Sequence, residues 1–242
     1  MPGKMMALMS VFTLELCLAS GNRLAEILPY KAVYSAKYNG LPITAVKTLT
    51  QTSDSHFLEE LRASGLMINL REASNYRVSD NGQLTPLDYQ IDRSFMGIRR
   101  SEFQNFDWEE KNAHYQRGEK SSIAPIEIGV LDIPTQYMQL RRDLAVGAEK
   151  FEYSVISRGQ HQTYRYEFVR HETLATPIGN LETIMMRRLR QNDTRVTNLW
   201  FAEDWHYLLV KLEQIENKKD YSMLLQEAEI GNKKVFTVNR SN

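Results

Sequence analysis

The chain has 242 residues, of which 42% are hydrophobic and 10% aromatic, and its 30 basic residues equal its 30 acidic residues in number. This composition is typical of a globular protein and excludes a disordered acidic chain, and the lack of a basic surplus argues against a nucleic-acid binder. The one cysteine, Cys17, excludes a disulfide framework and a cysteine-based zinc site.

The first 25 residues have the composition of a secretory signal peptide. Lys4 supplies a positive charge ahead of an apolar run over residues 5–19, which is shorter than the ~20 residues of a membrane-spanning helix. We predict cleavage between residues 19 and 25, leaving residues 26–242 as a single β-rich domain in the periplasm or outside the cell, with no transmembrane span. Glu15 interrupts the apolar run and no A-x-A site is present. An N-terminal amphipathic or buried helix is therefore the alternative.

From residue 30 onward, short runs of alternating apolar and polar residues are separated by turn residues such as Asn39-Gly40. Residues 109–120 are charged and contain a glycine, which predicts a loop or a hairpin tip. The neighbouring carboxylates Glu59 and Glu60 indicate a solvated face. The predicted strands of the first half cover residues 30–38, 43–51, 66–78, 87–95 and 99–108.

The second half has more regular spacing and predicts an antiparallel meander. On the strand after residue 180, the alternation places Leu181, Thr183 and Met185 on one apolar face. The predicted strands of this half cover residues 150–158, 162–174, 181–190, 195–201, 207–215 and 221–228.

One segment between the two halves has a helical period. Ile133, Tyr137, Leu140 and Leu144 recur at the spacing of one helix face, with Asp132 as the cap before them. A single amphipathic helix must bury its apolar face against the sheet. The predicted fold class is therefore mainly β: a curved antiparallel meander sheet, half-barrel or barrel-like, with one packed amphipathic helix.

Several recognisable runs follow one another along the chain: DIPTQYMQLR over 132–141, YRY over 164–166, TPIG over 176–179, LWFA over 199–202 and YLLVKLEQ over 207–214. Their order resembles a bacterial exported family known as domain of unknown function 3108. The resemblance covers most of residues 30–228, and it implies a secreted or periplasmic β-rich domain with no established reaction. It supplies no catalytic residues.

The polar residues show no recognisable catalytic or metal-binding pattern. None of the five histidines belongs to a local metal motif, and no nucleophile elbow or phosphate-binding glycine loop is present. His171 and Glu172 are adjacent, so on a strand they point to opposite faces. Asp204 and His206 could share a face, as a catalytic pair or as a turn hydrogen bond. We therefore expect no metal site, no cofactor and no assigned catalytic residue, which favours a protein that is not an enzyme.

The apolar strand faces indicate a binding protein. One helix cannot cover a sheet of perhaps ten strands, so either the sheet curls on itself or an apolar concavity stays open. The leading hypothesis is a non-enzymatic binder or carrier of an apolar or amphiphilic envelope molecule, such as a lipid. By residue type alone, the candidate lining residues are Tyr137, Leu140, Tyr166, Met185 and Trp200.

Two other functions remain open at this point. If the apolar residues fill the core, the protein is an interaction module that binds another envelope protein through a sheet edge or an apolar patch. A polar cleft with two facing carboxylates, or with Asp204 and His206 together, would indicate an enzyme acting on polysaccharide. A basic group made by Arg187, Arg188, Arg190 and Arg195 is either a cationic rim for anionic headgroups or a solvated hairpin tip.

Overall fold

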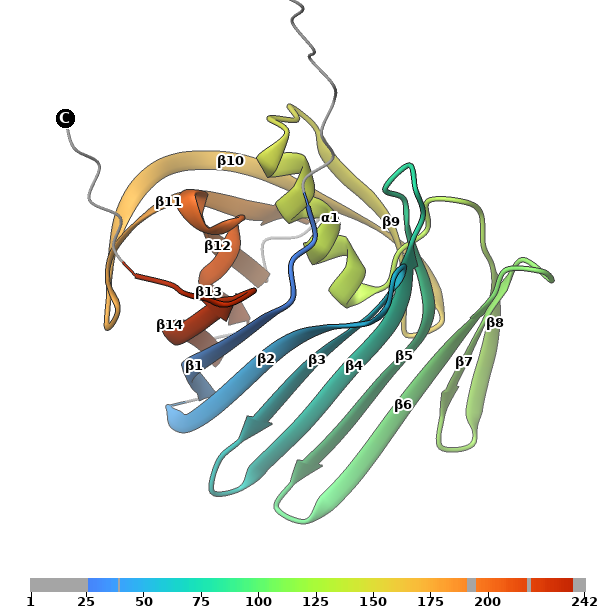
Figure 1. The fold of residues 1–242 in the computed structure, drawn as a ribbon. Helices are drawn as coiled ribbons and strands as arrows, with labels where there is room; N and C mark the ends of the chain where they lie inside the picture. The colour runs from blue at the N-terminus through green and yellow to red at the C-terminus, as the bar shows by residue number, and fades with distance from the viewer. Residues whose placement is uncertain (1–25, 39, 191–194, 217–218, 237–242) are drawn as a thin grey trace, which may run out of the picture.

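The structure, a computed structural model, describes residues 26–38, 40–190, 195–216 and 219–236 (Figure 1). The expected signal peptide and the Asn39 position of the first hairpin turn lie outside these residues. The described residues form a 15-stranded antiparallel sheet and one α-helix.

Eight strands precede the helix and form the first arm of the sheet. Each pairs with its neighbour in sequence through a short turn. They are β1 (Tyr30–Tyr38), β2 (Leu41–Ser53), β3 (His56–Ser64), β4 (Ile68–Val78), β5 (Leu84–Phe95), β6 (Ile98–Asp107), β7 (Asn112–Arg117) and β8 (Lys120–Pro125).

The helix α1 (Ile133–Ala145) follows, and the remaining strands form the second arm. The two arms join where the first strand, β1, pairs with β14, so that the sheet order is β8 to β1 followed by β14 to β9. The strands of the second arm are β9 (Phe151–Ser157), β10 (Gln160–Thr176), β11 (Gly179–Leu189), β12 (Arg195–Ala202), β13 (Leu208–Glu216) and β14 (Lys219–Ile230), with the short β15 (Lys233–Lys234) beside β14.

The β9/β10 turn brings the far ends of the two arms together. The Gly159 amide donates to Oε1 of Gln104 on β6 at 3.4 Å, and Ser122 Oγ on β8 donates to the Gly159 carbonyl at 3.5 Å. His161 Nε2 lies 2.5 Å from the Pro125 carbonyl oxygen. These contacts make a nearly closed barrel, which confirms the predicted curved, barrel-like antiparallel meander with one packed helix.

The first arm differs from the predictions in two places. Residues 56–64, which lie between two predicted strands, form β3, and Glu59 is buried with only 3% of its surface exposed. The buried carboxylate interrupts the apolar alternation that would identify this strand. Residues 109–120, predicted as a loop or a hairpin tip, include the turn of the β7/β8 hairpin but also the strand β7, whose Ala113 is buried in a small core with Phe106 and Ala124.

The helix has the predicted boundaries. The Asp132 side chain accepts a hydrogen bond from the Thr135 amide, and the chain turns away at Gly147, where a φ of 69° suits glycine. The helix lies inside the curve of the sheet and contacts β4, β5 and β9 (Figure 1). Because the sheet surrounds it, α1 buries polar side chains such as Gln136 and Arg141 as well as one apolar face.

Candidate functional site

The barrel has two different ends. The turns after β2, β4 and β6 lie at the end where α1 finishes, and the turns after β1, β3, β5 and β7 lie at the opposite end (Figure 1). Arg141 donates to the His206 carbonyl at the first of these ends, and Arg142 donates to the Gly82 carbonyl in the β4/β5 turn. We call the end where α1 finishes the helix end, and the opposite end the tip end.

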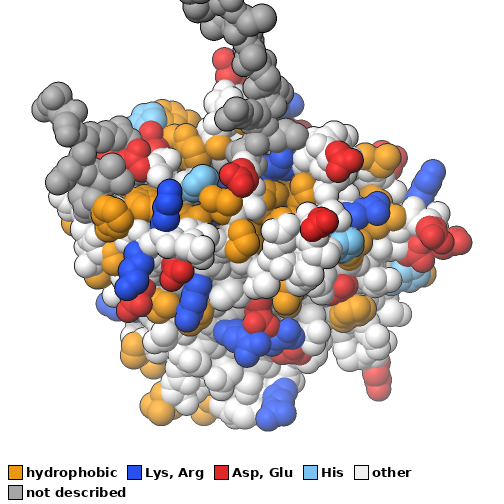
Figure 2. Space-filling model, in the orientation of Figure 1, with side chains coloured by type: hydrophobic (Ala, Val, Ile, Leu, Met, Phe, Trp, Pro, Cys, Tyr) orange, Lys and Arg blue, Asp and Glu red, His pale blue; other side chains and the backbone are white. Residues whose placement is uncertain are grey.

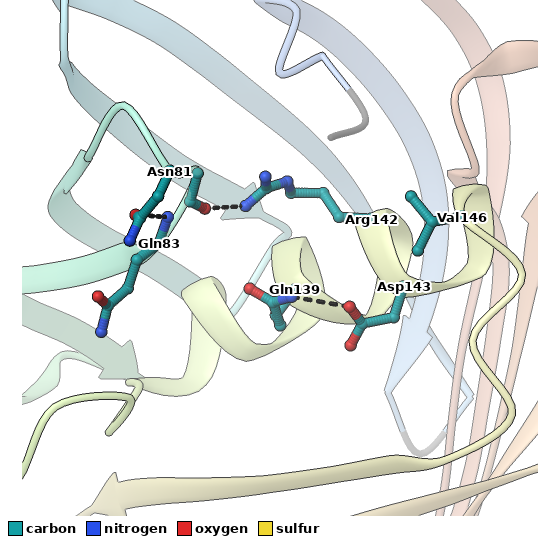
Figure 3. Close-up of a pocket in the computed structure, with 7 residues that line it drawn as sticks. Asn81, Gln83, Gln139, Arg142, Asp143 and Val146 are labelled. Atoms are coloured by element: carbon teal, nitrogen blue, oxygen red, sulfur yellow. Dashed lines mark hydrogen bonds between the residues drawn. The ribbon is translucent and has the colours of Figure 1, made fainter. Parts of the chain in front are cut away.

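At the helix end, a pocket of about 220 Å³ lies between α1 and the β4/β5 turn (Figure 3). Figure 3 shows Arg142 pointing from the helix toward this turn. Gln139 donates to Asp143 Oδ1 at 2.8 Å, and the Tyr153 hydroxyl donates to Asp143 Oδ2 at 2.7 Å. The polar side chains from the helix are therefore bonded to neighbouring protein groups, and the pocket is the place where α1 is fastened to the sheet.

The inner face of the sheet changes character along the strands. Near the helix its side chains are buried, as at Phe57, Tyr34 and Leu225. Toward the tip end, residues that alternate on the same face are partly exposed, although neighbouring strands stand on both sides of them. We call this surface the open half of the inner face. Its partly exposed apolar side chains are Leu61, Ala63, Ile68, Leu70, Leu212 and Tyr221.

Three of the five candidate lining residues lie inside the barrel. Leu140 is fully buried in the core, and the Tyr166 hydroxyl donates to Gln136 Oε1 of the helix at 2.9 Å. Tyr137 is partly buried, and its ring centroid lies 5.9 Å from Lys47 Nζ. Burial raises the pKa of Tyr137 above its ordinary value. Tyr137 therefore stands where the helix meets the open half of the inner face.

The other two candidates lie together on the outer face. Met185 and Trp200 are directly opposite each other in the β11/β12 pair. The Trp200 indole donates to Glu172 Oε1, and Lys211 Nζ lies 4.6 Å from the Trp200 ring centroid. Ile184 and Met186, rather than Met185, join the main core, because neighbouring residues of β11 point to opposite faces of the sheet. Met185 therefore does not join the main core with Leu181, although both side chains are buried.

The inner face also holds three carboxylates, each bonded to a neighbour. Lys47 Nζ lies 2.5 Å from Glu59 Oε1, which also accepts a hydrogen bond from the Tyr30 hydroxyl at 3.0 Å. The Tyr89 hydroxyl donates to Glu72 at 2.7 Å. Glu102 accepts hydrogen bonds of 2.8 Å from Arg93 and from the Tyr115 hydroxyl. Each of the three carboxylates is thus bonded to different partners. This arrangement does not support a pair of carboxylates acting on one substrate.

The basic group divides between the two faces of the sheet. Arg187 bonds to Asn198, whereas Arg188 lies over the Tyr164 ring, with its guanidinium carbon 3.2 Å from the ring centroid. The Arg188 Nε is buried and has no hydrogen-bond partner among the described residues. Burial, together with the charges of Arg188 and Arg195, lowers the pKa of Arg190 to about 10. Arg188 thus belongs to the inner wall rather than to a solvated tip.

The histidines considered for catalysis have other partners. His171 Nδ1 lies 2.9 Å from Glu203 Oε1 at the surface. His206 follows the 3₁₀ turn Glu203–Trp205 with a φ of 51°, and burial and the charge of Arg141 lower its pKa. No group of three or more histidine, cysteine or acidic side chains in the described ranges could hold a metal ion.

Asp132 makes the stability of the folded protein depend on pH. Burial raises its pKa from 3.8 to about 7, although its hydrogen bonds to Ser74 Oγ and Thr135 oppose the shift. Between about pH 4 and pH 7 the folded chain therefore binds more protons than the unfolded chain at this carboxyl, so stability falls as pH rises. Asn also caps a helix but does not titrate.

We expect Asp132→Asn to flatten the decline in unfolding free energy between pH 5 and pH 7 by on the order of 1–2 kcal/mol. Urea unfolding of the natural chain and of the variant at several pH values in this range measures the decline in each. A decline of equal slope in the variant would contradict the assignment.

None of the helices that the structure describes is long and apolar enough to span a membrane.

Comparisons with known proteins agree with the fold. A β-barrel-like protein of domain of unknown function DUF1849 from Brucella abortus superimposes with a TM-score of 0.55 at 6% identity, covering 85% of this chain and 99% of that one. A predicted lipoprotein from Parabacteroides distasonis gives 0.33 at 10% identity, covering 85% of this chain and 97% of that one. This second score is too low to show a shared fold.

No curated protein matches the chain in sequence. The family model described as protein of unknown function (DUF3108) matches residues 33–226, which is most of the chain and agrees with the resemblance seen in the sequence. The chain belongs to the DUF3108 family.

Proposed function

We propose that this protein is a non-enzymatic binder of an amphiphilic molecule, which it holds against the open half of the inner face. The observation that carries the proposal is the loss of burial along that face. Leu61, Leu70 and Leu212 alternate with the core residues of their strands and yet remain partly exposed. A sheet that turned these side chains inward only to pack its core would cover them completely.

The apolar part of the ligand would lie among these leucines and Tyr221, on both arms of the sheet. Side chains from different strands then surround a chain-like molecule, as apolar ligands require. Methionine adds adaptable apolar surface at Met223, which packs beside Tyr221 through its sulfur, 3.6 Å from the Tyr221 hydroxyl.

The polar part of the ligand would face the cationic groups near the helix. Lys47 and Arg188 lie on opposite arms of the sheet, and each influences the Tyr137 hydroxyl electrostatically. The unbonded Nε of Arg188 adds a buried donor to this region. Because Lys47 already pairs with Glu59, an acidic headgroup would complement Arg188, so an amphiphile suits the site better than a purely apolar molecule.

The predicted signal peptide and the family resemblance together support a location in the periplasm or outside the cell. There the protein would carry its ligand between surfaces of the envelope. The distinct partners of Glu59, Glu72 and Glu102 give the polysaccharide-acting enzyme less support than the binder.

Filling the open half should abolish binding. Ala63 faces the inside and Ser64, the next residue of β3, is exposed on the outside. We expect Ala63→Trp to weaken the affinity for the fluorescent acid cis-parinaric acid at least tenfold, because the indole occupies the space of the acyl chain. Fluorescence titration with palmitic acid as competitor measures the affinity.

Ser64→Trp is the matched control, since it adds the same bulk to the same strand on the opposite face. It should bind the probe as the natural chain does, and both variants should show the natural melting transition. Equal affinity in all three proteins, or no saturable binding by the natural chain, would refute the proposed site.

A further inference from the structure

The tip end carries a cluster of exposed apolar side chains on neighbouring hairpins. Leu66, in the β3/β4 turn, is 95% exposed, and Met96 and Ile98, at the β5/β6 turn, are each 66% exposed. The two turns are joined by a hydrogen bond of 2.9 Å from the Met96 amide to the Met67 carbonyl. Figure 2 shows hydrophobic side chains at the lowest points of the visible face. We call this cluster, with Met67 and Phe95, the apolar tips.

Positive charge surrounds the apolar tips. Within three residues of the Met96-Gly97 and Gly118-Glu119 turns, the only carboxylate is Glu119. Arg99 and Arg100 follow the β5/β6 turn, are exposed, and form no ion pair with any described residue. The cations near these two turns are Arg93, Arg99, Arg100, Arg117 and Lys120, of which Arg93 and Arg117 lie within 4.0 Å of the Glu102 carboxylate. The charges without an ion-pair partner among the described residues therefore include those of Arg99 and Arg100.

We infer that the tip end docks on an anionic lipid surface, with the apolar tips inserted among the headgroups and the arginines against the lipid phosphates. The exposed apolar side chains lie on separate protruding turns and do not form one continuous surface. A fluid bilayer can adapt its shape to each turn. Unpaired arginines beside them complement negative headgroups. The inference stands independently of the proposed ligand. If both hold, the open half of the inner face opens toward the bilayer.

Vesicle sedimentation tests this docking surface with the full purified chain. We expect the protein to sediment with phosphatidylglycerol vesicles, far less with phosphatidylcholine vesicles, and progressively less as salt increases. The double variant Met96→Asp/Ile98→Asp should lower the partition coefficient about tenfold or more, because charge replaces the inserted apolar surface. Asp also tolerates the left-handed backbone at Met96, whose φ is 50°.

A charge-reversal pair tests the cations separately. Arg99→Glu/Arg100→Glu should weaken binding to phosphatidylglycerol vesicles and reduce its dependence on salt. Two controls lie at the helix end: Ile128→Asp, at a side chain that is 84% exposed, and Lys233→Glu/Lys234→Glu on the exposed β15. Both controls should bind as the natural chain does.

Three results would overturn the inference. The natural chain could fail to sediment with either kind of vesicle, the tip variants could bind as it does, or the helix-end controls could lose as much binding as the tip variants. Light scattering of the same samples tests whether a second copy of this chain, rather than lipid, binds the apolar tips. If the natural chain binds no vesicles but is a dimer that the tip variants dissociate, the tips bind a second copy rather than lipid.

Discussion

Gly159→Ala is expected to destabilise the protein strongly, by about 2–4 kcal/mol, because a methyl group at this position has no room. A Cβ there would lie 2.1 Å from Ser122 Oγ and 2.8 Å from Tyr115 Cβ. The residue also has a φ of 69°, where only glycine is unstrained. Since the β9/β10 turn closes the barrel against β6 and β8, the clash should also loosen that seam. Denaturant unfolding measures the free energy, and hydrogen exchange at β8 and β9 reports the opening.

Gly118→Ala separates the clash from the backbone strain. Gly118 has a similar φ of 58° in the neighbouring β7/β8 turn, but a methyl group added there would meet nothing within 4 Å. It should therefore lose only about 1 kcal/mol, the strain of a left-handed alanine. Equal losses in the two variants would show that the seam at Gly159 is not closely packed.

Lys47→Met should be the most damaging change within the inner face. It leaves Glu59, which is 3% exposed, as a buried carboxylate whose remaining hydrogen bond comes from Tyr30. Removing one partner of a buried ion pair destabilises proteins by about 3–5 kcal/mol. Burial alone would lower the pKa of Lys47, but the Glu59 carboxylate outweighs it and raises that pKa above its usual value. The free energy of unfolding at pH 7 measures the loss.

The double variant Lys47→Met/Glu59→Gln should recover much of that stability, because no uncompensated charge then remains. Lys211→Met is the surface control. Lys211 lies 2.7 Å from Glu213 in a pair that is 28% and 41% exposed, and such pairs contribute at most about 1 kcal/mol. If Lys47→Met were no more harmful than Lys211→Met, the inner ion pair would not hold the sheet.

Most of the fold could be predicted from the sequence because its elements are local. Strands of the second arm are separated by turn residues, and the helix has its cap, its period and its terminating glycine in one short segment. The strand β3 could not be predicted in this way because its inner residue Glu59 is charged. The partner that makes its burial tolerable, Lys47, lies on another strand and is invisible to a local pattern.

The candidate site was harder to predict for a geometric reason. Alternation divides the residues of a strand between two faces, but it does not tell which face turns inward when both carry apolar side chains, as Met185 and Met186 do on β11. Met185 and Trp200 lie outside, whereas Tyr137, Leu140 and Tyr166 lie inside. In the sequence, Arg188 is one of four arginines near a turn. Only its position across from Tyr166 in β10 places it on the inner wall.

Native extraction shows directly whether the open half of the inner face holds an amphiphile. The full chain with its N-terminal segment is expressed in a Gram-negative host, purified without detergent, and its organic extract is analysed by mass spectrometry. We expect a near-stoichiometric amphiphile with an acidic headgroup, reduced in Ala63→Trp and retained in Ser64→Trp. An extract without any such molecule, from a folded protein that also fails to bind cis-parinaric acid, would contradict the proposed function.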